Sequence, residues 1–179
     1  KIWLSTDKIV TWRKFKYLGM RRKIYNALLK WKNEENGAVA LLVEGARRVG
    51  KSYIVEEFAK REYKSYILVD FAHISNSMKT VFDEYLNETE TFFMYLQNVA
   101  GVHLYPRESL IIFDEVQLYP MARQAIKHLV ADGRYDYIET GSLVSINENT
   151  QDILIPSEER PIQMNPMDFE EFLWALGDE

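Results

Sequence analysis

The sequence predicts an α/β domain in which a parallel β-sheet is covered by helices on both faces. Short apolar runs alternate along the chain with segments of helical periodicity, as in repeated βαβ units. The run at residues 38–43 is continuously apolar, which is typical of a strand buried on both faces. With 179 residues, 47% of them hydrophobic and 27% charged, the chain can form a sizeable core and is not expected to be disordered.

Periodicity predicts the elements of the first half in order. Ile24, Leu28 and Trp31 fall at helical spacing, and the Asn36-Gly37 turn ends that helix. Apolar runs of strand length and helical repeats then alternate as follows: a strand at 38–44, a helix at 50–62, a strand at 66–71 and a mostly helical stretch at 76–99.

The second half continues this alternation. Its predicted elements are a strand at 109–116, a helix at 122–130, a strand at 135–139, a polar mobile loop at 146–159, a strand at 160–164 and a last helix. Asn165 can cap the last helix, Pro166 suits its first turn, and Asp168 has a favourable position near the positive end of the helix dipole. Gly177 marks its end. The helix presents an apolar face made of Phe169, Phe172, Leu173 and Leu176.

Composition and charge exclude several classes of protein. The chain has no cysteine, which excludes disulfides and cysteine-ligated metal sites and fits a reducing, cytoplasmic setting. No apolar run approaches the ~18 residues of a membrane-spanning helix, so a membrane is not an expected partner. We expect a basic extension at residues 1–19 and one domain at residues 20–179. The oligomeric state is not readable from the sequence.

The charge is unevenly distributed. Residues 1–32 hold ten Lys or Arg and one acid, although the whole chain has a net charge of −5. This basic arm could bind an anionic partner, support self-association or be no more than a solvated helix. Its mixture of Trp, Lys and Arg could contact nucleic acid, but the acidic remainder of the chain is unlike a dedicated nucleic-acid binder.

The segment at residues 45–52 matches the phosphate-loop (Walker A) pattern G-x-x-x-x-G-K-[ST]. It follows an apolar strand and opens a helix, which is the context that the motif requires. Glycines permit the close approach of backbone N–H groups to an anion, and the helix start adds its positive dipole end. The nucleotide is expected to contact Gly45, Ala46, Arg47, Arg48, Val49, Gly50, Lys51, Ser52 and Tyr53. Lys51 can reach the β- and γ-phosphates, and the Ser52 hydroxyl can ligate Mg²⁺.

An acidic pair of Walker B type ends the strand at residues 109–116. Four apolar residues precede Asp114 and Glu115, at the sheet edge where ligands of parallel sheets bind. Two carboxylates there are costly to desolvate without a nearby cation. Asp114 is therefore the candidate for holding Mg²⁺, and Glu115 is the candidate for orienting and deprotonating the attacking water.

The next strand ends in residues 139–142, Glu-Thr-Gly-Ser. If this strand lies between the first and the third, Thr140 and Ser142 project near the γ-phosphate. Either could hydrogen-bond the attacking water or the phosphate, and either could instead cap a helix or form a turn.

These motifs, together with Asn165-Pro166-Met167-Asp168 and the following FEEFL at residues 169–173, resemble a prokaryotic family of AAA-type ATPases. The resemblance covers roughly residues 20–176. It implies a three-layer P-loop NTPase fold of the ASCE class, with about five parallel strands in the order 5-1-4-3-2, and it implies ATP as the nucleotide. In the family a nuclease-like domain usually follows the ATPase domain, so the resemblance implies that this chain is part of a longer protein, in which a C-terminal domain is a possible partner.

Two departures from the family pattern stand out. Met167 and Asp168 replace a Leu and a Ser in the family's last motif. The arginine before it usually follows a glycine, whereas Arg160 follows Glu159, and we therefore expect Arg160 to form a salt bridge rather than to sense phosphate.

The leading hypothesis is an ATPase, a hydrolase of acid anhydrides, that uses ATP and Mg²⁺ to drive a conformational change in a larger protein. A nucleotide-dependent switch without catalysis would share the phosphate loop and would not need Glu115. A small-molecule kinase on the same loop would require an acceptor pocket and an arginine-rich lid. Residues 146–159 contain no arginine, which counts against a kinase.

Overall fold

The computed structural model describes residues 21–142 and 157–177. The predicted extension at residues 1–19 and nearly all of the predicted loop at 146–159 lie outside these residues. Among the described residues, no helix has both the length and the apolar composition needed to span a bilayer. The described elements, in chain order, are α2 (Ile24–Glu35), β1 (Ala40–Gly45), α3 (Lys51–Glu62), β2 (Ser65–Asp70), α4 (Asn76–Tyr85), α5 (Thr89–Ala100), β3 (Ser109–Asp114), the 3₁₀ turn η1 (Val116–Leu118), α6 (Pro120–Asp132), β4 (Asp136–Ser142), β5 (Glu159–Met164) and α8 (Phe169–Leu176).

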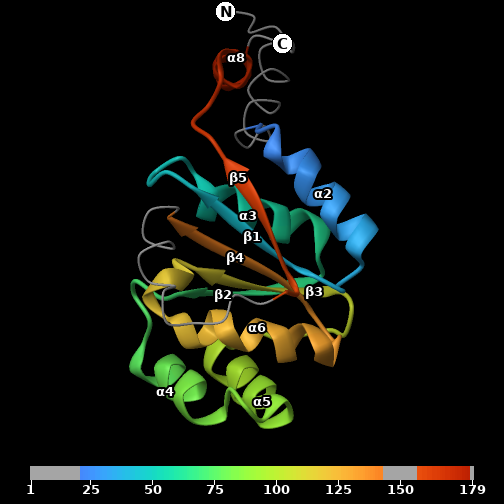
Figure 1. Cartoon of the computed structure of the whole chain (residues 1–179), viewed down its shortest axis with the longest axis vertical. Helices are drawn as coiled ribbons and strands as arrows, with labels where there is room; N and C mark the ends of the chain where they lie inside the picture. The colour runs from blue at the N-terminus through green and yellow to red at the C-terminus, as the bar shows by residue number, and fades with distance from the viewer. Residues whose placement is uncertain (1–20, 143–156, 178–179) are drawn as a thin grey trace, which may run out of the picture.

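The five strands form one parallel sheet in the order β2-β3-β4-β1-β5 (Figure 1). This is the expected order 5-1-4-3-2 read from the opposite edge, so the α/β P-loop NTPase-like fold is confirmed. β4 lies between β1 and β3, which brings the end of β4 between the phosphate loop and the acidic pair.

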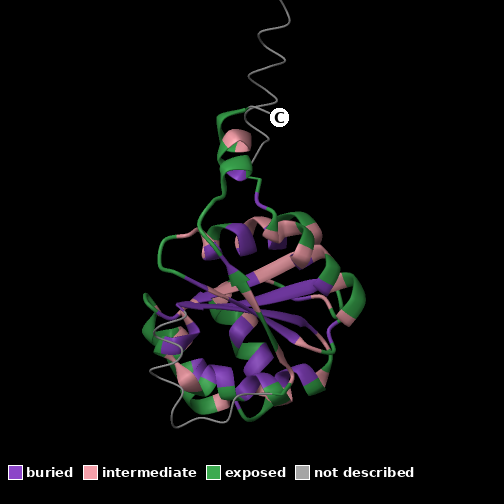
Figure 2. Cartoon of the chain, turned by 45° about the horizontal axis from the view of Figure 1, so that its top comes forward, coloured by how far each residue is buried: buried purple, intermediate pink, exposed green. Residues whose placement is uncertain are grey.

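Successive side chains of each strand alternate between two hydrophobic layers. In β3, Leu110 and Ile112 pack with α2 and α3, whereas Ile111 and Phe113 pack with α4, α5 and α6. Both faces of the central strands are therefore buried, as the purple strands in Figure 2 show. This explains why the sequence runs are continuously apolar rather than alternating.

The predicted helical stretch at 76–99 forms two helices, α4 and α5, because the chain turns after Tyr85, whose carbonyl accepts a hydrogen bond from the Glu88 N–H at 2.8 Å. Two predicted strands need correction at their ends. β3 ends at Asp114, and β4 continues through Thr140 to Ser142, so the last strand residues are neither a turn nor a helix cap.

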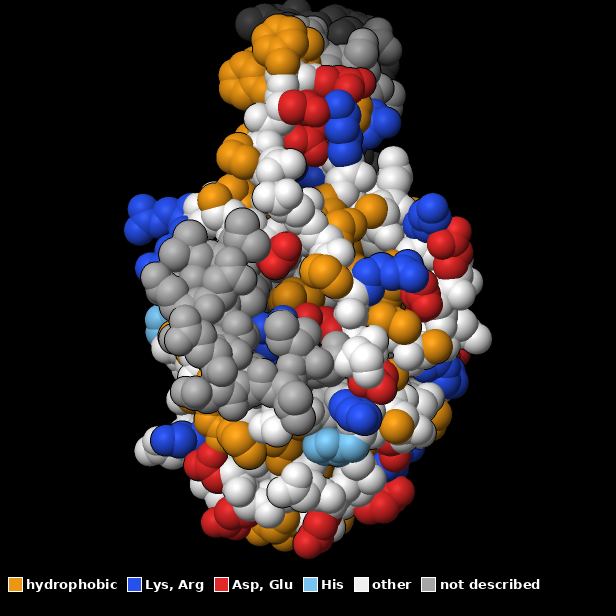
Figure 3. Space-filling model, in the orientation of Figure 1, with side chains coloured by type: hydrophobic (Ala, Val, Ile, Leu, Met, Phe, Trp, Pro, Cys, Tyr) orange, Lys and Arg blue, Asp and Glu red, His pale blue; other side chains and the backbone are white. Residues whose placement is uncertain are grey.

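The last helix also begins later than its Asn165-Pro166 signal predicted. Asp168 is its N-cap, and Asp168 and Glu171 form a capping box. The expected apolar face exists, but most of it is exposed: Phe169 is 76% exposed, and Phe172 and Leu176 are also exposed. In Figure 3 hydrophobic side chains (orange) gather on this helix at the top of the molecule, beside a group of acidic and basic side chains.

Candidate functional site

The phosphate loop connects β1 to α3 and is shaped by its two glycines. A Cβ atom on Gly45 would lie 2.2 Å from the backbone oxygen of Met164 in the neighbouring strand β5, so only glycine fits at this position. Gly50 precedes α3 with a φ angle of 94°, in the left-handed region that favours glycine. The loop therefore has its tight form because β5 lies directly against its first residue.

Lys51 opens α3 and points back into the loop. Its side chain is largely buried, and Nζ donates hydrogen bonds to the carbonyl oxygens of Gly45 at 3.2 Å and Ala46 at 2.9 Å. Burial lowers the pKa of the Lys51 ammonium, whereas the nearby carboxylates of Glu115 and Asp114 act to raise that pKa. The ammonium group is thus held inside the loop, at the start of a helix whose first N–H groups have no partner within the helix.

Asp114, Ser52 and Thr140 meet on the α3 side of the sheet. Asp114 and Thr140 have the same strand parity as Ile112 and Ile138, which pack toward α3. The Ser52 hydroxyl donates to Asp114 Oδ1 at 2.7 Å, and the Thr140 hydroxyl also donates to that oxygen. Three residues that are far apart in the sequence therefore form one hydrogen-bonded group beside the phosphate loop.

Glu115 follows directly after this group. Its φ angle of 55° turns the chain sharply after β3, and its N–H donates to the Thr140 hydroxyl at 3.3 Å. The Gln117 amide donates to the Glu115 carboxylate. The turn thus directs Glu115 away from the strand direction. Thr140 holds the backbone N–H of Glu115, and Gln117 holds its carboxylate.

The remaining predicted site residues lie around this centre. Ser142 is buried and pairs in register with Gly45. It lies two residues after Thr140 in β4, so both side chains are on the same face of the sheet. Arg47, Arg48 and Tyr53 are on the exposed side of the loop and helix. The structure therefore brings Lys51, Ser52, Asp114, Glu115 and Thr140 together, with Ser142 at the base of the loop.

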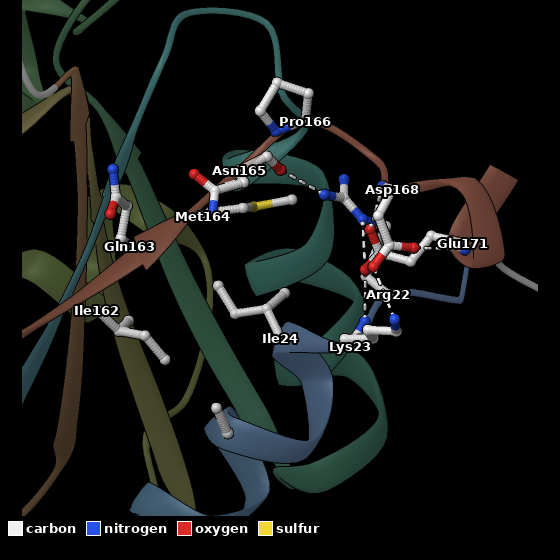
Figure 4. A pocket seen from close by; sticks show the side chains of 11 residues that line it. Arg22, Lys23, Ile24, Ile162, Gln163, Met164, Asn165, Pro166, Asp168 and Glu171 are labelled. Atoms are coloured by element: carbon white, nitrogen blue, oxygen red, sulfur yellow. Dashed lines mark hydrogen bonds and ion pairs between the residues drawn. The ribbon is translucent and has the colours of Figure 1, made fainter.

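A pocket of about 350 Å³ adjoins the phosphate loop (Figure 4). It is formed by the start of α2, the end of β5 and the segment that leads to α8. Ile24, Ile162, Met164 and Pro166 give it apolar walls, and Arg22 and Glu171 lie on its α8 side. Arg22 connects it to the loop, because Nη1 donates to the Val49 carbonyl at 2.8 Å.

The oxygen atoms of this site fit a magnesium ion. Among the described residues, no cluster of three or more His, Cys, Asp or Glu side chains could hold a metal by itself. Mg²⁺ does not need such a cluster, since it typically takes one or two protein oxygens together with phosphate oxygens and water. The Ser52 hydroxyl and the buried Asp114 carboxylate, 2.7 Å apart, supply two such oxygens.

Sequence reasoning missed Arg22, Gln117 and Glu171. Gln117 could have been suspected from its place two residues after the acidic pair. Glu171 lies in the FEEFL stretch that carries the family resemblance, but neither it nor Arg22 was assigned to the site, because Arg22 bonds to Asn165 across 143 positions of the chain. Arg160 was predicted to form a salt bridge, and its pairing with Glu35 confirms this.

Comparison with known proteins gives one family. A family model described as an AAA domain matches residues 38–173. Among solved structures, the chain is similar to the one titled "Structure of C. elegans PCH-2", with 13% identity and a TM-score of 0.37. That match covers 82% of this chain and 40% of the other, so the chain spans less than half of that protein's length. No curated protein gives a significant match.

Proposed function

Because the chain belongs to the AAA domain family, we propose that it binds ATP together with Mg²⁺ and hydrolyses it to ADP and phosphate. The observation that carries this proposal is the convergence of Lys51, Ser52, Asp114 and Glu115 at one edge of the sheet. The first two follow from the phosphate-loop motif, and the hydrogen bond between Ser52 and Asp114 joins that motif to the acidic pair. We further propose that hydrolysis drives a conformational change in a larger protein.

The phosphates would bind where Lys51 now contacts the carbonyl oxygens of its own loop. Entry of a triphosphate would give the ammonium a stronger, charged acceptor, and the loop N–H groups would cradle the same anion. Ser52 and Asp114 would hold Mg²⁺, which would offset the charge that develops on the phosphate oxygens. The adenine ring of ATP would lie in the neighbouring pocket, where Ile24 and Met164 offer apolar surfaces to a planar ring.

Glu115 is the proposed general base. Its carboxylate would accept a proton from a water molecule while the water oxygen bonds to the γ-phosphorus and the bond to the β-phosphate bridge oxygen breaks. Two hydrogen bonds would fix Glu115 in place. Gln117 donates to the Glu115 carboxylate, and the Glu115 backbone N–H donates to the Thr140 hydroxyl. Thr140 and Ser142 would also lie near the terminal phosphate.

The test is phosphate release from the full chain with Mg²⁺ and either ATP or GTP. Glu115→Gln keeps the shape of the side chain and removes the base, so turnover should fall by roughly 100- to 10,000-fold while nucleotide affinity is retained. Glu108→Gln, which changes an exposed surface acid, is the control and should leave turnover unchanged.

Equal turnover in wild type and Glu115→Gln would refute the assigned role of Glu115. Tight ATP binding without any turnover in the wild type would favour the nucleotide-dependent switch. A phosphorylated acceptor in place of free phosphate would identify a kinase.

A further inference from the structure

Arg22 joins three separate parts of the molecule. It lies just before α2, is only 5% exposed, and extends its guanidinium between the phosphate loop and α8 (Figure 4). Nη1 donates to the carbonyl oxygen of Val49 at 2.8 Å, and Nη2 donates to that of Asn165 at 2.7 Å. Nε lies 3.2 Å from Glu171 Oε1. One buried cation thus contacts the phosphate loop, the segment after β5 and the last helix.

Glu171 is the matching acid in α8. Its Oε1 also accepts the Lys23 N–H at 2.7 Å, and its Oε2 accepts the Asp168 N–H at 3.1 Å. Burial acts to raise the pKa of Glu171, but these N–H groups and Arg22 outweigh burial, so the pKa is lowered. The carboxylate is therefore ionised at neutral pH and holds the starts of both α2 and α8 to Arg22.

Within the part of the chain that the structure describes, α8 has few other contacts. The Arg21 guanidinium lies 4.2 Å from the centroid of the Trp174 ring, and Lys23 lies near the same ring. Of its eight residues, all of them described, only Glu171 is buried, and Phe169 and Leu176 face outward. Lys23 pairs with Asp168 and Glu170, but these are exposed ion pairs of the kind that contributes little. Of the ion pairs that hold α8 within the described residues, the Arg22–Glu171 pair is the buried one.

We propose that Arg22 and Glu171 form a link through which nucleotide binding at the phosphate loop sets the position of α8. This inference rests on the proposed function. Lys51 contacts the loop carbonyls of Gly45 and Ala46, and a triphosphate would replace those contacts and rearrange the loop backbone. The Val49 carbonyl belongs to that same loop, so its bond to Arg22 passes the rearrangement on to Glu171 and α8. Binding and helix position are then linked reciprocally.

The absence of cysteine makes a distance measurement direct. Met94→Cys on α5 and Ala175→Cys on α8 place two nitroxide labels at opposite ends of the molecule (Figure 1). Pulsed electron spin resonance then gives the distance distribution with and without Mg²⁺ and a non-hydrolysable ATP analogue. We expect the distribution to shift when the analogue binds.

Two substitutions test the link in this labelled protein. Glu171→Gln removes the charge that holds Arg22, and the shift should be lost although calorimetry still detects binding of the analogue. Arg22→Lys keeps a positive charge but lacks the planar fork that donates to two carbonyls while it forms an ion pair with a carboxylate, so the shift should be lost or reduced. Glu170→Gln is the matched control, since Glu170 neighbours Glu171 but pairs with Lys23 instead, and it should retain the shift.

The outcomes separate the two proposals. If the analogue binds and the distance distribution does not change, or changes equally in Glu171→Gln, the proposed Arg22–Glu171 link is refuted. The proposed nucleotide-binding site is then still supported. If the labelled protein binds no analogue, the proposed function fails and the link fails with it.

Discussion

At the scale of single residues, the parity of a strand position decides which chemistry a side chain can perform. Thr140 faces α3 and joins the hydrogen bonds around Asp114, whereas its neighbour Glu139 faces the opposite layer, where Arg123 and Glu159 lie. Glu139 is fully buried there. Burial raises the pKa of the Glu139 carboxyl well above 4.5, and the proximity of Glu159 raises it further.

This buried acid predicts a decline of stability with rising pH. The unfolded chain loses the Glu139 proton near pH 4.5, whereas the folded protein keeps it to a higher pH. The folded state therefore binds more protons over this interval, and the free energy of unfolding falls as pH rises above 4.5, by up to about 1.4 kcal/mol per pH unit.

Glu139→Gln removes this ionisation and keeps the shape of the side chain. Urea unfolding between pH 5 and 8 should show the variant gaining stability relative to wild type as pH increases. A constant difference across that pH range would mean that Glu139 does not hold its proton in the folded state.

At the scale of elements, the edge strand β5 is fixed by a buried ion pair. Arg123 of α6 contacts Glu159, the first residue of β5, through two hydrogen bonds of 2.9 and 2.8 Å. Both side chains are at most 4% exposed. Among the described strands, β5 pairs only with β1, and its residue Met164 lies against Gly45, so this ion pair also supports the phosphate loop from outside.

Arg123→Met should destabilise the fold by about 3–5 kcal/mol, because it leaves a buried carboxylate without its cation. Arg160→Met is the control, since Arg160 lies in β5 next to Glu159. The Arg160 side chain is 51% exposed in its pair with Glu35, so the loss of this pair should cost less than about 1 kcal/mol. Urea unfolding at neutral pH measures both, and equal losses would show that burial does not distinguish the two pairs.

The Arg22–Glu171 contact and α8 show where sequence reasoning reached its limit. The phosphate loop and the acidic pair could be predicted because each lies within a few consecutive residues and has a fixed chemical pattern. The Arg22–Glu171 contact could not, because ion-pair partners far apart in the chain leave no periodic signal. The apolar spacing of α8 predicted a helix correctly, but spacing alone does not say whether another part of the molecule covers that face.

At the scale of the whole molecule, the strand order makes the site. Placing β4 between β1 and β3 brings Thr140 between the loop that follows β1 and the acids that end β3. All five strands run parallel, so their carboxyl ends meet at one edge, where ligands of such sheets bind. Three segments distant in sequence thus converge there, and this convergence supports nucleotide binding more strongly than the motif alone.

The most direct test is calorimetric titration of the folded chain with Mg²⁺ and ATP, comparing wild type with Lys51→Ala. The wild type should bind, since Lys51, the loop N–H groups and the Ser52–Asp114 pair together offset the charge of the polyphosphate. Lys51→Ala should lose most of that binding while its circular dichroism spectrum stays unchanged. No heat of binding in the wild type, or undiminished affinity in Lys51→Ala, would contradict the account.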